Sequence, residues 1–116
     1  MNILIKDIIH SNFAVSTDDG DKINRVLNDR FIKKESIILN FKGITLLTTS
    51  FLNAAIGKLY SNEKYTSDFL NTHITMINVE SEDKHLFSMV IKRAKEYFTN
   101  KDEFEKNSQD SIYGNN

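Results

Sequence analysis

The chain has 116 residues, the size of one domain with a single hydrophobic core. Its 15 Lys and Arg residues nearly balance its 16 Asp and Glu residues, so the net charge gives no reason to expect nucleic acid or a membrane surface as partner. No cysteine is present, which excludes disulfides, thiolate nucleophiles and cysteine zinc sites and favours a cytoplasmic location.

The first part of the chain predicts two strands, a helix and a third strand. Ile3–Ile9 and Phe13–Val15 are rich in β-branched and apolar residues, and we expect them to form a β-hairpin. The polar residues at 16–21 are typical of a helix start, and apolar residues then recur at helical spacing as far as Phe31. Ile37–Phe41 is short and almost continuously apolar, the pattern of a strand buried on both faces.

The second part predicts a helix, a strand, a further helix and a polar tail. We expect a helix from Ser50 to near Asn62, with Ser50 as its N-terminal cap, and then a strand over His73–Val79. The last helix carries a wide apolar stripe that is expected to pack on the sheet; its members are Leu86, Phe87, Val90, Ile91, Ala94, Tyr97 and Phe98. Residues 101–116 are too polar to bury much, which predicts a flexible tail.

The order of these elements predicts one α/β domain over residues 1–100, with the succession β-β-α-β-α-β-α. Because strand-helix-strand units place neighbouring strands in parallel, three main helices are expected to pack against a mixed or parallel sheet of about four strands. The opening residues lack the apolar region of a signal peptide, and no apolar run approaches the about 20 residues of a membrane-spanning helix.

The segment from Leu39 to Leu59 resembles the STAS-like family of small bacterial proteins, distant relatives of the anti-sigma-factor antagonists. Those antagonists have a buried strand that ends in an aspartate-containing apolar tripeptide, and an Asp-Ser pair at the start of the following amphipathic helix. Here Leu39-Asn40-Phe41 takes the place of the tripeptide. Ser50-Phe51 matches a Ser-Phe pair that is common at this helix start in STAS-like relatives. The order of elements extends the likeness to most of the chain.

The resemblance implies a non-enzymatic regulatory or adaptor module that binds a protein, with a histidine-kinase-type ATPase or an anti-sigma-like regulator as partner. In the antagonists such a kinase phosphorylates the serine at the helix start, and the added charge releases the partner. Ser50 is the matching phosphorylation candidate, and Thr49 is the adjacent one. This chain has Thr48, Phe51 and Asn40 where the antagonists have the acid, a glycine and the tripeptide aspartate. A simple capping role for Ser50 therefore stays open as the alternative.

A polar surface around this helix start is the predicted partner-binding site. Its residues are Lys42, Thr45, Thr48, Thr49, Ser50, Asn53 and Lys58. A serine at a helix N-terminus faces unpaired backbone N–H groups and the positive end of the helix dipole, both of which stabilise a phosphate. Ordinary polar surface is the alternative interpretation of the same residues.

The second hypothesis is a structural subunit or homodimerising domain without a phosphoswitch, with Phe69, Tyr97 and Phe104 forming the contact. A small hydrolase or transferase is the third, but the sequence contains neither a glycine-rich phosphate loop nor a nucleophile motif. His10, His73 and His85 lack the close spacing of metal ligands. We therefore expect no enzyme activity, no cofactor and no bound metal.

Overall fold

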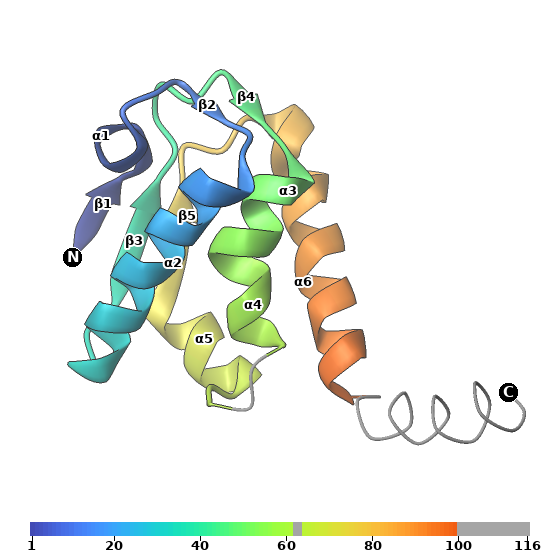
Figure 1. Cartoon of the computed structure of the whole chain (residues 1–116). Helices are drawn as coiled ribbons and strands as arrows, with labels where there is room; N and C mark the ends of the chain where they lie inside the picture. The colour runs from blue at the N-terminus through green and yellow to red at the C-terminus, as the bar shows by residue number, and fades with distance from the viewer. Residues whose placement is uncertain (62–63, 100–116) are drawn as a thin grey trace, which may run out of the picture.

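The computed structural model describes residues 1–61 and 64–99 (Figure 1), so the predicted tail at 101–116 lies outside the described residues. The described strands are β1 (Asn2–Leu4), β2 (Phe13–Ala14), β3 (Ile37–Asn40), β4 (Leu46–Leu47) and β5 (Ile74–Ile77). The α-helices are α1 (Ile5–Ile9), α2 (Thr17–Ile32), α3 (Thr49–Leu52), α4 (Lys58–Tyr60), α5 (Ser67–His73) and α6 (Lys84–Thr99). The domain is therefore of the mixed α/β class, as predicted.

The predicted strand over Ile3–Ile9 is confirmed only at its start and is wrong over Ile5–Ile9, because β1 ends at Leu4 and α1 follows it. Ile5 and Ile9 lie one helical turn apart and are both buried, so their burial favours a turn of helix over the strand preference of isoleucine. His10 then adopts a left-handed conformation, with φ at 56°, which ends the helix.

The strands form two small parallel sheets instead of one sheet of about four strands. One sheet has the order β1-β3-β5, and the other is the pair β2-β4. The expected β-hairpin is absent from the described part, because β1 pairs with β3 and β2 pairs with β4. With α1 inserted between them, β1 and β2 lack the short turn that a hairpin needs.

The long helix α2 matches its prediction. The Ser16 side chain caps it by accepting a hydrogen bond from the backbone N–H of Asp19 at 3.1 Å. Ile23, Leu27 and Phe31 share one face of the helix and are buried. The sequence therefore predicted the polar segment that holds the cap, residues 16–21, and the buried face of this element.

The second predicted helix is interrupted between α3 and α4 by a π-helical segment, Asn53–Gly57, which we call the π-turn. A π-turn displaces backbone carbonyls from regular pairing, and the Asn24 amide donates to the carbonyl of Ala55 at 3.2 Å. Gly20 of α2 lies against the same segment: a Cβ atom there would lie 2.5 Å from the carbonyl oxygen of Phe51. The absence of a side chain at Gly20 thus lets the two helices approach closely.

Helix α5 was not predicted from the sequence, and it carries part of an aromatic cluster. Phe69 contacts Phe31 edge to face at 5.3 Å between ring centroids, and it stacks on His73 at 4.0 Å. The nearby hydroxyl of Tyr60 donates to Asn71 at 2.8 Å. Burial raises the pKa of Tyr60 above its usual value. These rings therefore lie at the end of the core next to α5, the lower end in Figure 1.

Helix α6 packs beside the α3–α4 helix, and Figure 1 shows α2, α3–α4 and α6 standing next to one another with the sheet strands behind α2. Phe87 and Val90 of its predicted stripe are buried, whereas Tyr97 and Phe98 have side chains outside the described set. The Phe87 ring meets the Phe41 ring at the end of β3, with centroids 5.2 Å apart. The described part of the stripe therefore packs mainly on the α3–α4 helix, and Phe87 in its first turn contacts Phe41 just after β3.

Within the described residues, no helix combines the length and apolar character needed to span a membrane.

Candidate functional site

Two helix N-termini lie side by side at one end of the domain. The parallel strands β2 and β4 lead directly into α2 and α3, respectively. Thr48, the residue before α3, donates its backbone N–H to Ala14 at 3.1 Å and its hydroxyl to the Val15 carbonyl at 2.9 Å. These hydrogen bonds hold the start of α3 against the start of α2. The positive ends of both helix dipoles therefore point toward the same end of the molecule.

Thr48, not Ser50, is the N-terminal cap of α3. Its hydroxyl oxygen accepts a hydrogen bond from the backbone N–H of Phe51 at 3.3 Å. Ser50 lies within the first turn of the helix, and its side chain is exposed. The predicted cap at Ser50 is therefore wrong, because the observed cap lies two residues earlier than the sequence pattern indicated. The Ser50 hydroxyl makes no hydrogen bond within the described residues, so it is accessible.

The roles of Thr48 and Ser50 at this helix start can be separated by mutation. We expect Thr48→Ala to lower the free energy of unfolding by about 1 kcal/mol, because it removes both the cap and the bond to Val15. Ser50→Ala is the matched control and should leave stability nearly unchanged. Urea unfolding followed by circular dichroism measures both variants, and an equal loss for the two would contradict the assignment of Thr48 as the cap.

Ser50, Asn53 and Lys58 meet in one open pocket between the α3–α4 helix and α6, which we call the α3–α6 pocket. Its volume is about 550 Å³, and it is lined by Thr17, Ser50, Asn53, Ala54, Gly57, Lys58, Ser61, Arg93 and Ala94. The Lys58 ammonium pairs with Asp21 at 2.6 Å. Arg93 makes no ion pair with a described residue. The pocket is thus lined by both the Arg93 guanidinium, which no described residue pairs, and the Ser50 hydroxyl.

The predicted partner-binding residues do not form a single cluster. Lys42 and Thr45 lie on the loop between β3 and β4, where the Lys42 N–H donates to Asn40 Oδ1 at 3.0 Å. The Thr45 N–H donates to the Asn12 carbonyl at 2.8 Å. Thr49 is half-buried at the start of α3. The predicted set therefore divides between this loop, the helix start and the α3–α6 pocket.

An exposed apolar pair beside this region was missed by the sequence analysis. Phe13 of β2 and Leu46 of β4 are direct partners in the strand register, and they are 55% and 53% exposed. The next residues along, Ala14 and Leu47, are buried, as the alternation of side chains in a strand requires. We call Phe13 and Leu46 the apolar pair. Because Leu46 adjoins Thr45 and is two residues before Thr48, the pair extends the predicted polar surface.

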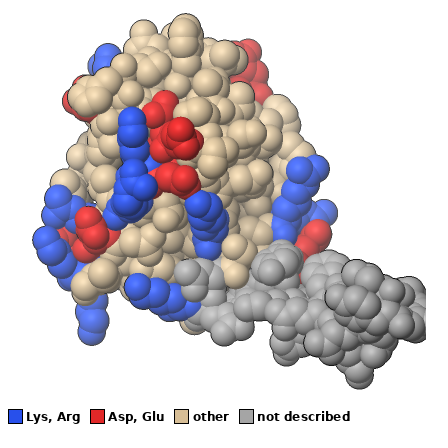
Figure 2. Space-filling model, viewed as in Figure 1, with Lys and Arg blue, Asp and Glu red and all other residues tan. Residues whose placement is uncertain are grey.

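Charges of both signs alternate on the face that carries α2. Figure 2 shows Lys and Arg side chains next to Asp and Glu side chains there. The Lys22–Asp19 pair, with N and O atoms 3.3 Å apart, is one example. This face therefore presents no single-sign patch of the kind that attracts a phosphate backbone.

The aromatic and histidine residues of the other hypotheses take structural positions. Phe69, a predicted dimer contact, packs within its own domain against Phe31 and His73, while the Tyr97 side chain and Phe104 lie outside the described set. His73 Nδ1 lies 2.9 Å from the Phe69 carbonyl oxygen. In residues 1–61 and 64–99, no three His, Asp or Glu side chains gather in a way that would hold a metal ion.

The chain matches a known protein-family model. The model of a STAS-like domain of unknown function covers residues 20–84, more than half of the chain. The matched region runs from α2 to the start of α6 and includes β4, the cap of α3 and the π-turn. Comparison with curated proteins and with solved structures found no significant match. The resemblance drawn from Leu39–Leu59 is thus confirmed at the level of the family, and the chain belongs to the STAS-like domains.

Proposed function

We propose that this domain is a non-enzymatic regulatory adaptor that binds a protein partner through the apolar pair and the start of α3. The observation that carries the proposal is the exposure of Phe13 and Leu46, directly paired across β2 and β4. Exposed apolar side chains that adjoin one another and are bordered by polar residues are typical of protein interfaces. Thr45 and Lys42 provide such a border on the loop before β4.

The partner class in this proposal is a histidine-kinase-type ATPase or an anti-sigma-like regulator. It is what the resemblance to the anti-sigma-factor antagonists implies, since those distant relatives bind such proteins, and membership of the STAS-like domains is consistent with that resemblance. The apolar pair fits binding beside a helix start, because Leu46 comes shortly before α3 in the chain.

The regulation in this proposal is phosphorylation of Ser50, with Thr49 as the second candidate. Ser50 is exposed and lies near two helix N-termini, whose dipoles favour an added negative charge. Arg93 lines the same pocket and is not engaged in an ion pair with the described residues. A phosphate of about −1.5 to −2 charge would therefore be stabilised on the domain while changing the charge presented to the partner.

Phosphorylation is tested by incubating the purified chain with histidine-kinase-type ATPases encoded in the same genome, together with ATP and magnesium. Intact-mass spectrometry should detect a gain of about 80 Da, the mass of a phosphate group. Ser50→Ala should abolish the gain, whereas Thr49→Ala, the matched control, should retain it.

Three other outcomes have distinct meanings. A gain that survives the double replacement of Ser50 and Thr49 would place the modification elsewhere and refute the switch. A stable complex without a gain in mass would support the adaptor function and refute the phosphoswitch. If neither a complex nor a gain is found and the chain sediments as a dimer, the structural-subunit hypothesis replaces the proposal.

A further inference from the structure

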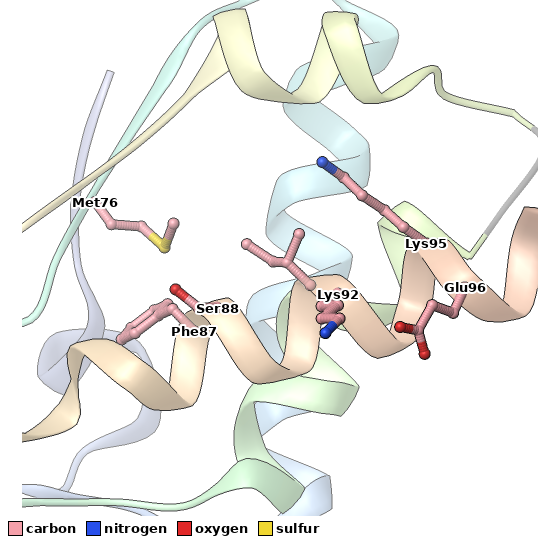
Figure 3. Close-up of a pocket in the computed structure, with 7 residues that line it drawn as sticks. Met76, Phe87, Ser88, Lys92, Lys95 and Glu96 are labelled. Carbon is pink, nitrogen blue, oxygen red and sulfur yellow. The ribbon is translucent and has the colours of Figure 1, made fainter.

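A second depression, the β5–α6 groove, lies between the edge strand β5 and one side of α6. Its volume is about 690 Å³, and its lining residues are Met76, Phe87, Ser88, Ile91, Lys92, Lys95 and Glu96. Figure 3 shows Met76 extending from β5 toward Phe87 and Ser88 on α6, with Lys95 near the other end of the groove. A smaller hollow of about 320 Å³ shares Met76 and Phe87 and continues the groove toward Val79.

The floor of the groove follows one row of residues along α6. Phe87, Ile91 and Lys95 are four residues apart, so they form a ridge about 12 Å long on one side of the helix. The Phe87 ring is held by its edge contact with Phe41, whereas Ile91 and Met76 are only partly buried. A ridge of this length, apolar at Phe87 and Ile91 and cationic at Lys95, matches about two turns of a second, amphipathic helix.

The end of the groove nearer the C-terminus of α6 is positively charged. Lys92 has no ion-pair partner among the described residues, and the Lys95 ammonium lies 5.4 Å from the centroid of the Tyr60 ring. Arg93 adds a third cation on the neighbouring side of α6, and among the described residues Glu96 is the one acid that lines this end. A partner with carboxylates at this end would be electrostatically complementary.

We propose that the β5–α6 groove binds an acidic amphipathic helix of a protein partner. Its apolar side chains would lie on Met76, Phe87 and Ile91, and its carboxylates would face Lys92 and Lys95. The groove shares no residue with the apolar pair or with the phosphorylation candidates, so this site goes beyond the proposed function. A domain with both sites joins two proteins instead of binding one.

The test is a titration of the ¹⁵N-labelled full chain with a synthetic helical peptide of about 14 residues, which spans the ridge with a turn to spare at either end. The peptide carries leucines along one face and glutamates on both flanks. The matched control peptide has lysine at every glutamate position. We expect the acidic peptide to shift the amide signals of Met76, Phe87 and Ile91 and to bind at least about tenfold more tightly than the control. In the Lys92→Glu, Lys95→Glu double variant the preference should reverse.

Several results would overturn the proposal. One is equal affinity for the two peptides, and another is signal changes confined to Phe13 and Leu46. The absence of binding at about 1 mM acidic peptide would also refute the proposal, because a Kd weaker than this is too weak for a functional partner helix. If Phe104→Ala in the otherwise intact chain raises the affinity for the peptide, the occupant of the groove is the chain's own segment 101–116 and not a partner.

Discussion

Replacing Phe13 or Leu46 with alanine is expected to weaken binding of the partner protein by about thirtyfold each. The physical reason is that apolar side chains at the centre of an interface often contribute about 2 kcal/mol or more, which corresponds to this change in Kd. Both side chains are more than half exposed in the isolated domain, so their truncation removes little packing within the fold. Isothermal titration calorimetry with the ATPase identified by complex formation measures the change.

Ile32→Ala is the matched control for this prediction. Ile32 is 68% exposed at the end of α2, away from the apolar pair and the start of α3. Its truncation should leave both affinity and thermal stability unchanged. If Ile32→Ala weakens binding as much as Phe13→Ala does, the partner does not recognise the apolar pair specifically. If neither change has an effect, the interface lies elsewhere on the domain.

Gly20→Ala is expected to destabilise the domain by about 2 kcal/mol, although alanine is the better helix former. A Cβ atom at this position would lie 2.5 Å from the Phe51 carbonyl oxygen and 2.7 Å from the Ala54 Cβ atom. The neighbouring atoms are backbone and a short side chain, so neither can move aside without separating α2 from the π-turn. The hydrogen bond from Asn24 to the Ala55 carbonyl would be strained by the same separation.

Gly57→Ala, in the π-turn on the side that meets α6, provides the control. Its Cβ atom would lie 3.2 Å from a Val90 methyl group and 3.3 Å from Asn53 Oδ1, contacts that side-chain adjustment can relieve. We expect a change within about 1 kcal/mol for this variant, since the gain in helix preference offsets the crowding. Chemical unfolding measures both free energies. A stabilised Gly20→Ala variant would show that the two helices can separate freely.

The elements that sequence predicted best are those with a long, regular apolar pattern. Helix α2 has a cap at Ser16 and a buried row that ends at Phe31, and both signals point to the same structure. In α1, however, the β-branched isoleucines favour a strand while their spacing allows a helix, and the tertiary burial of Ile5 and Ile9 decides between the two. Leu70 is the fully buried residue of helix α5. A single buried position gives too little periodicity to identify the helix from the sequence.

The parts of the candidate site that depend on local side-chain chemistry were predictable from the sequence. The parts that depend on strand pairing and on hydrogen bonds between distant segments were not. The cluster of Thr48, Thr49 and Ser50 marked a helix start, but only the hydrogen bond that the Thr48 hydroxyl accepts from the Phe51 N–H identifies which hydroxyl forms the cap. Sequence alone does not distinguish an exposed phenylalanine from a buried one. The exposure of Phe13 follows from the pairing of β2 with β4, and β4 has just two residues.

The parallel pairing of the three-stranded sheet determines when it can form during protein synthesis. Asn2 is opposite Ile38, and Ile37 is opposite Ile74, so each ladder joins segments that the ribosome makes at well-separated times. A nascent β1 must therefore wait for β3, and β3 must wait for β5, before the sheet is complete. The contact between α2 and the π-turn needs the chain as far as Gly57, so it can form after the β1–β3 pair and before β5 has been made. Translation would thus leave the pairing of β5 with β3 as the last step of the sheet.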